Sequence, residues 1–170
     1  NREDAGDIYD RVHISFHSNA GGGRGTVALI TGDPTPSQAE LAEIVGGEVN
    51  DDLVAFGSPP LEAAWFNKSG HTYTGGYGEI DGSSFGYEMP ATIVEVAYHD
   101  NATDALLMRD PKGRAAVARA TLHGVIKFMN AYDTNGAPPL AFLPEAPTNL
   151  RAIAGTNGQI SFAWTAPVSS

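Results

Sequence analysis

Two side chains are candidates for chemistry because of the segments that carry them. His17 closes a stretch that alternates in period two, Arg-Val-His-Ile-Ser-Phe-His over residues 11–17. Glu95 is the one charge in the apolar run Ala-Thr-Ile-Val-Glu-Val-Ala-Tyr over residues 91–98. Burying an unpaired carboxylate costs several kcal/mol, so Glu95 must be paired, protonated or directed into a cavity. In open α/β sheets that cavity lies beyond the carboxyl ends of the strands, so both side chains could face one site.

Neighbouring histidines leave alternatives open. His99 follows Glu95 at i+4 on the same strand face and could simply neutralise it. His13 alternates with His17, so it is either a second ligand or partner or, more simply, a half-buried histidine. A single histidine or buried glutamate is often structural, so residue type alone does not establish a site.

Residues 57–88 are rich in Gly, Ser, Pro and aromatic residues and read as a long working loop. Loops of this length are uncommon in compact domains and often cover or shape a site. Glu79 and Glu88 could hold the loop down or bind substrate, although solvated carboxylates are the simplest interpretation. His71, in this loop, and His123, on a helix flank, are expected to have plain surface roles.

The elements that position these residues alternate between strand and helix. The alternating segment 11–17 and residues 26–31 are expected strands, separated by a glycine-rich turn. A helix over 37–55 opens with a capping-box pattern, Ser37 followed by Glu40. Its apolar residues recur at helical spacing: Leu41, Ile44, Val45, Val49 and Leu53.

The second half of the chain continues this alternation. Residues 91–98 have the composition of a central strand covered on both faces. A short helical turn over 104–108 and a long helix beginning at Asp110-Pro111 should follow. The apolar face expected for the long helix contains Ala118, Leu122, Val125, Ile126 and Met129. The sequence therefore predicts an α/β fold with a mixed, largely parallel central sheet flanked by helices.

A change in composition at Pro138 divides the chain. Residues 1–137 form the α/β part, 138–145 read as a stiff proline-rich linker, and 146–170 begin a new unit. The alternation over 160–164 after Ala146-Pro147 resembles the opening of a fibronectin type III domain. Such a β-sandwich needs roughly 100 residues and seven strands, so this truncated start could not bury Trp164 alone.

Composition excludes several classes of function. The formal charge of -10 argues against a nucleic acid or an anionic membrane as the main partner. No run approaches the ~20 apolar residues of a membrane span, and the amino-terminal residues contain no apolar signal core. With no cysteine, any metal must bind to histidine and carboxylate side chains.

Two ordered motifs resemble the amidase 3 family of zinc-dependent N-acetylmuramoyl-L-alanine amidases. His17-Ser18-Asn19-Ala20, a glycine-rich turn and Gly25-Thr26 resemble the family's second-histidine motif. About eighty residues downstream, residues 89–95 resemble its closing segment, with these further matches: Asn101, Asp104, Leu107, Gly124 and Phe128. The resemblance covers about residues 7–132.

The resemblance implies a zinc ion held by His, Glu and His, and hydrolysis of the amide between N-acetylmuramic acid and L-alanine in peptidoglycan. On this sequence, His17 would be the second histidine ligand and Glu95 the general base and proton shuttle. Asn19, Glu79 and His99 are the candidate substrate-binding residues. Peptidoglycan as substrate implies an extracellular, periplasmic or cell-envelope location for this secreted, autolysin-like enzyme.

The family's first histidine and its ligand glutamate have no counterpart before His17, and Glu3 and Asp4 match no motif. We therefore expect an upstream segment of the same parent chain to supply the other ligands, and weak or absent zinc binding without it. Two alternatives remain: a carboxypeptidase-like zinc peptidase, or a cell-wall binding module that has lost catalysis.

Overall fold

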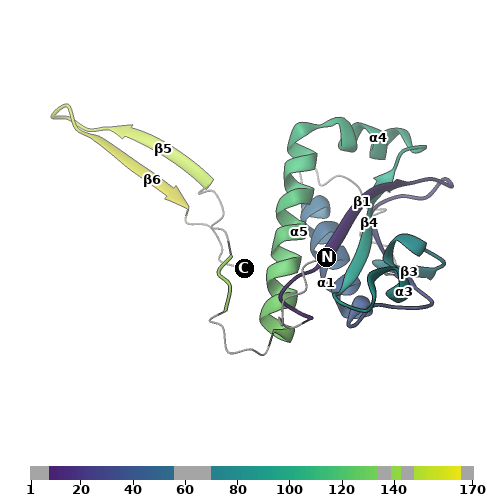
Figure 1. Cartoon of the computed structure of the whole chain (residues 1–170). Coiled ribbons are helices and arrows are strands. Elements are labelled where there is room, and N and C mark those ends of the chain that lie inside the picture. Colours follow the sequence, from purple (N-terminus) through teal and green to yellow (C-terminus); the bar gives the residue numbers. More distant parts are fainter. Residues whose placement is uncertain (1–7, 56–69, 134–138, 143–147, 166–170) are drawn as a thin grey trace. The chain divides into compact units, whose positions relative to one another are not determined.

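The computed structural model describes residues 8–55, 70–133, 139–142 and 148–165 (Figure 1). The chain divides into two compact units, Asn1–Leu140 and Ala141–Ser170. Within the described residues, every helix is too short or too polar to cross a membrane.

The first unit is built on a sheet with the strand order β1-β4-β2-β3. These strands are β1 (His13–Asn19), β4 (Ala91–Tyr98), β2 (Val27–Thr31) and β3 (Thr72–Gly75). β1 is parallel to β4 and β2 is parallel to β3, whereas β2 and β4 are antiparallel. The predicted mixed, largely parallel sheet is confirmed, and the strand that carries Glu95 is central.

Two long helices, α1 (Gln38–Ala55) and α5 (Pro111–Tyr132), cover one face of this sheet. Four residues of α1 at i, i+4 spacing are completely buried: Leu41, Val45, Val49 and Leu53. They pack with Val94 of β4 and Phe128 of α5 in the main hydrophobic core. The helix predicted over 37–55 is confirmed. Ser37, the expected capping residue, has a φ of 50° rather than the extended backbone typical of such a residue, and its hydroxyl lies 2.9 Å from that of Tyr9.

The apolar face predicted for α5 was partly wrong. Leu122 is 40% exposed, whereas Val117, Gly124 and Phe128 are buried. A Cβ added to Gly124 would lie 2.8 Å from the Cα of Val45, so the backbones of the two helices approach each other closely there. Because a glycine lies on the buried face, the positions of large apolar residues alone did not reveal that face.

Side-chain caps begin the last two helices. The Asn101 carboxamide accepts hydrogen bonds from the backbone of Thr103 and Asp104, so the predicted turn over 104–108 is a complete helix, α4 (Ala102–Arg109). The Asp110 carboxylate accepts from the Lys112 N–H, with Pro111 at the first helical position, as predicted.

The prediction of a long loop over 57–88 was wrong for the part that the structure describes. Residues 57–69 lie outside the described residues, and the remainder contains β3, a 3-10 helix η1 (Gly78–Ile80) and a short helix α3 (Gly82–Phe85). Ile80 is completely buried, and a second small core forms around it from Val27, Leu29, Ala91 and Ile93. These elements are too short to show a hydrophobic period.

The surface roles expected for His71 and His123 were wrong. His123 is buried, with 3% exposure, and His71 is half-buried with its carbonyl accepting from the Ala28 N–H. His13 is half-buried as predicted, and its ring centroid lies 4.8 Å from that of Phe85.

The second unit contains an antiparallel hairpin of β5 (Thr148–Ala154) and β6 (Ile160–Thr165). Phe162 and Trp164 are 61% and 58% exposed, as expected of a segment too short to bury them. The strand over 160–164 is confirmed. The fibronectin type III start over 146–170 and the linker over 138–145 stay predictions, and residues 143–147 and 166–170 lie outside the described residues.

Candidate functional site

The polar site lies on the sheet face opposite α1 and α5. In the parallel pair of β1 and β4, His17 is the register partner of Glu95. Strand alternation directs Val12 and Ile14 into the helix-side core and leaves Ser15 and His17 on the face of Glu95. The two predicted chemical residues are therefore neighbours on one face.

Glu95 is the most unusual carboxyl group of the site. Its Oε2 is buried and has no hydrogen-bond partner among the described residues. Burial raises the pKa of Glu95 above its ordinary value, and nearby Glu79 raises it further, while His17 and His99 oppose that shift. A carboxyl group in this state can hold or release a proton nearer neutral pH than an exposed one.

Glu79 fixes the imidazole of His17. The His17 Nε2 and Glu79 Oε2 atoms are 3.1 Å apart, and both side chains are partly exposed. Ser15 donates a 2.5 Å hydrogen bond to the other carboxylate oxygen, and this bond is the main cause of the lowered pKa of Glu79. Sequence reasoning missed Ser15, although its place on the face of His17 in the period-two pattern was a usable signal.

The remaining predicted residues lie where β1 and β4 end. Asn19 is the register partner of Tyr98, and its backbone carbonyl accepts from the His99 N–H. The Nδ1 of His99 lies 3.0 Å from the Ser18 hydroxyl. The five candidate residues therefore gather at the carboxyl ends of β1 and β4, together with η1: His17, Asn19, Glu79, Glu95 and His99.

Two aspartates fasten the glycine-rich turn that follows β1. Asp100 accepts hydrogen bonds from the backbone of Gly21 and Gly22, which lower its pKa. The fully buried carboxylate of Asp104 accepts from Arg24 Nε at 3.0 Å and from the Gly25 N–H at 2.9 Å. It also accepts from the Tyr98 N–H, so one side chain joins the turn to the end of the central strand.

A hollow of about 300 Å³ opens beside Glu95 on the polar face. Val27 and Leu29 of β2 contribute its apolar part. Its other lining residues are Asn19, Glu95 and three tyrosines: Tyr73, Tyr77 and Tyr98. The hollow therefore combines a carboxyl group of raised pKa with an aromatic lining, a combination typical of ligand sites.

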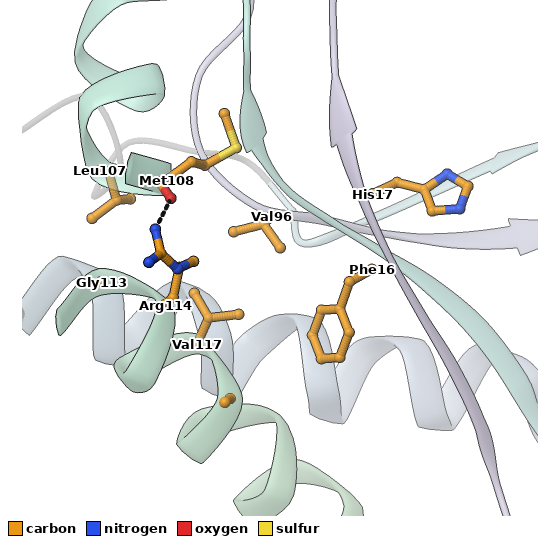
Figure 2. Close-up of a pocket in the computed structure, with 9 residues that line it drawn as sticks. Phe16, His17, Val96, Leu107, Met108, Gly113, Arg114 and Val117 are labelled. Carbon is orange, nitrogen blue, oxygen red and sulfur yellow. Dashed lines mark hydrogen bonds between the residues drawn. The ribbon is translucent and has the colours of Figure 1, made fainter. Parts of the chain in front are cut away.

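A second hollow of about 300 Å³ lies between the strands and the ends of α4 and α5 (Figure 2). Phe16, Val96 and Val117 give it apolar walls, and Arg114 at its rim donates a 3.0 Å hydrogen bond to the Met108 carbonyl. Figure 2 shows the imidazole of His17 directed away from these apolar side chains. Phe16, on the edge strand β1, lines this groove and is 52% exposed.

The donor types at the site suit zinc, but their number does not complete a zinc site. Imidazole and carboxylate groups are ordinary zinc ligands. His17 and Glu79 meet directly, yet no three histidine, aspartate or glutamate side chains converge to hold a metal in the described parts of the chain. These residues therefore supply donors that suit zinc without forming a complete metal site within the described residues.

No protein-family description matches the chain, and no curated protein matches its sequence. Several solved structures share its fold. The N-acetylmuramyl-L-alanine amidase Ami1 of Mycobacterium smegmatis aligns with a TM-score of 0.53 and 20% identity, covering 71% of this chain and 54% of that protein.

Two further amidases align similarly. The CwlD amidase of Clostridioides difficile, solved in complex with the GerS lipoprotein, has a TM-score of 0.55 and 15% identity, with 71% of this chain and 55% of that one covered. The catalytic domain of CwlV, the amidase of Bacillus (Paenibacillus) polymyxa, has a TM-score of 0.52 and 19% identity, with 69% and 57% covered. The chain has the fold of these amidases and spans between 54% and 57% of their length.

Proposed function

We propose that this chain is the catalytic-carboxylate part of a zinc-dependent N-acetylmuramoyl-L-alanine amidase of the amidase 3 family. Its substrate would be the amide between N-acetylmuramic acid and L-alanine in peptidoglycan. The observation that carries the proposal is Glu95, whose buried Oε2 has no partner within the described residues and whose register neighbour is His17. The fold shared with solved amidases supports the same assignment.

Glu95 acts as the general base and then as the general acid. It takes a proton from water as the water oxygen adds to the amide carbonyl, and it gives that proton to the leaving nitrogen as the C–N bond breaks. The products are the carboxyl group of the muramic acid and the free amine of alanine. The raised pKa of Glu95 suits this exchange, because it makes the carboxylate a stronger base toward water than an exposed glutamate would be.

His17 is the proposed zinc ligand of this chain. Its imidazole lies at the strand end, where Glu79 holds the ring by the 3.1 Å contact to Nε2. When bound, a zinc ion with an open position lowers the pKa of water toward ~7 and polarises a carbonyl group. Asn19, Glu79 and His99 surround the same strand ends and are proposed to contact substrate.

The remaining ligands are proposed to come from an upstream segment of the parent chain. The matched amidases contain more than 40% of their length outside the part that this chain matches, since it covers 54% to 57% of them. The exposed ring of Phe16 and the apolar groove in Figure 2 adjoin His17 and give such a segment a surface to pack on. Without it, the present chain should bind zinc weakly.

Peptidoglycan lies outside the cytoplasm, so the protein is proposed to act in the periplasm, the cell envelope or the extracellular space. The incomplete donor set supports one second candidate, a cell-wall binding module without catalysis. A carboxypeptidase-like zinc peptidase is distinguished by its product, a released carboxyl-terminal amino acid.

The test is a Glu95→Gln substitution in the complete parent protein, assayed on purified muropeptides. Turnover should fall by at least about 100-fold, the usual contribution of a general base, with little loss of binding. Glu88→Gln is the matched control, because Glu88 pairs with Arg11 at 3.8 Å and is not in the site. Glu95→Gln protein that still releases free muramic acid ends at the parent rate would overturn the assignment of Glu95.

A further inference from the structure

The tyrosine-lined hollow beside Glu95 is built by close contact with glycines. A Cβ at Gly23 would lie 2.8 Å from the Tyr98 hydroxyl oxygen and closer still to its ring. A Cβ at Gly75 would lie 2.9 Å from both Cε2 and the hydroxyl of Tyr77. Both rings therefore occupy space that a side chain at Gly23 or Gly75 would take up, so a substitution at either glycine should displace the ring beside it.

The third ring is open to solvent. Tyr73 is 61% exposed on β3, next to the apolar floor formed by Val27 and Leu29. Burial raises the pKa of Tyr77 and of Tyr98, with the charge of Glu95 adding to it, so both keep their phenol protons. The three rings present apolar faces together with hydroxyl groups that can donate hydrogen bonds.

The charge of the hollow selects among the parts of a peptidoglycan substrate. Its lining contains one carboxylate, Glu95, and no lysine or arginine among the described residues. Glu79 and Asp100 add negative charge nearby, since Glu79 acts on the pKa of Glu95 and Asp100 on that of Tyr98. A stem peptide carries carboxylates that would be repelled here, whereas a sugar ring inside the glycan strand is neutral.

Size points to the same ligand. A hollow of about 300 Å³ lies at the lower end of small-molecule sites, so it accommodates a ring of monosaccharide size rather than an extended chain. The C–H face of a pyranose packs on aromatic rings, and its hydroxyl and N-acetyl groups need donors such as the amide NH₂ of Asn19.

We propose that Tyr73, Tyr77 and Tyr98 form a subsite for a neutral N-acetylated pyranose ring, which places the sugar side of the scissile amide beside Glu95. This inference rests on the proposed function, since it names which half of the substrate the hollow holds. Tyr73, Tyr77 and Tyr98 position the sugar, and Gly23 and Gly75 leave room for the rings of Tyr98 and Tyr77.

The test titrates the full chain with two probes and follows tyrosine ring signals by NMR. One probe is neutral N,N′-diacetylchitobiose, and the other is a stem tripeptide, L-Ala-D-Glu-L-Lys. Chitobiose should shift the signals of all three rings, and the tripeptide should leave them in place. Tyr73→Ala should weaken chitobiose binding by roughly 3- to 10-fold, the value of one aromatic contact, whereas Tyr73→Phe should retain it.

Gly23→Ala provides an independent variant, because it displaces the Tyr98 ring without removing any aromatic group. It should weaken chitobiose binding as well. Tyr87→Ala is the control for loss of an exposed tyrosine elsewhere, since Tyr87 is 48% exposed and bonds to Asp33. Circular dichroism verifies that each variant is folded.

Ring shifts with the tripeptide alone, or equal chitobiose binding by Tyr73→Ala and the parent chain, would overturn the subsite. These outcomes are separate from the proposed function, which is tested by muropeptide hydrolysis in the complete parent. Hydrolysis without chitobiose binding refutes only the subsite. Chitobiose binding without muropeptide hydrolysis refutes the proposed amidase activity and retains the sugar-binding subsite.

Discussion

The two faces of the central strand β4 place neighbouring residues in opposite environments. Val94 is completely buried against α1 and α5, whereas the next residue, Glu95, faces a hollow. The Oε2 atom of Glu95 has no hydrogen-bond partner among the described residues. The helix face is closed by large apolar side chains at regular spacing. The other face is closed only around Ile80 and is open at the strand ends. Stability should therefore reside mainly on one face and chemistry on the other.

The largest expected effect is on the helix face. Phe128→Ala should lower the free energy of unfolding by about 3–5 kcal/mol, because the fully buried ring leaves a cavity between α5 and Tyr9. Urea denaturation measures this change. Leu122→Ala on the same helix is the control and should cost about 1 kcal/mol or less, since Leu122 is 40% exposed. Equal losses from the two variants would contradict the assignment of the buried face.

A smaller loss is expected from Asp104, the buried aspartate at the open end of the sheet. Asp104→Asn should cost about 2–3 kcal/mol, because the buried carboxylate accepts hydrogen bonds from Arg24, Gly25 and Tyr98. Glu43→Gln on the exposed side of α1 should be nearly neutral. Thermal unfolding of both variants provides the measurement, and an unchanged melting temperature for Asp104→Asn would show that the turn needs no such anchor.

Glu95→Gln, unlike the two preceding variants, should increase the stability of the fold at neutral pH. The raised pKa means that the folded state favours the protonated carboxyl, so wild-type stability is highest below the ordinary pKa of 4.5 and falls as pH rises through the higher folded-state pKa. At pH 7 the glutamine variant should be more stable than wild type, and the difference should vanish below pH 4.5. Melting curves across this pH range test it. A variant less stable than wild type at pH 7 would assign Glu95 a structural role.

The smallest effect on stability is expected from Asp100, which holds the glycine-rich turn after β1. Hydrogen bonds from Gly21 and Gly22 depress the pKa of Asp100, so its contribution is present above the unfolded value of 3.8 and is lost as pH falls through the folded-state pKa. Asp100→Asn should melt at a slightly lower temperature at pH 7 and at the same temperature as wild type in strong acid. Because Asp100 is exposed, added salt should reduce the difference. A difference that persists at pH 2 would have another cause.

The sequence predicted the parts of the fold that have a long, regular pattern. The i, i+4 spacing from Leu41 to Leu53 predicted α1, and the apolar run over 91–98 predicted the central strand. The strand β3 was not predicted, because its four residues, Thr72–Gly75, are too few to show a hydrophobic period. They form a strand by pairing with β2. The predicted buried face of α5 was partly wrong because Gly124, which has no side chain, packs closely against Val45 of α1.

The candidate site was predictable only as single residues. Strand position singled out His17 and Glu95, and their register confirms that they are neighbours. The contact of Ser15 with Glu79 joins residues 64 positions apart, so no local pattern could reveal it. The roles of His17 and Glu95 stay predictions until turnover and metal binding are measured.

The three consecutive glycines after β1 should tolerate substitution very differently in a mutational scan. Gly21 and Gly22 have φ values of 111° and 75° and nothing within 4 Å of an added Cβ, so their requirement is conformational. Asparagine and aspartate should be the best replacements at Gly22, because they adopt positive φ most readily. Gly23 has the opposite requirement: an added Cβ would meet the Tyr98 ring, so any side chain there must displace that ring, whatever its backbone preference. The three glycines therefore meet two unrelated constraints: a backbone conformation at Gly21 and Gly22, and room for the Tyr98 ring at Gly23. Only the constraint at Gly23 affects the aromatic wall beside Glu95.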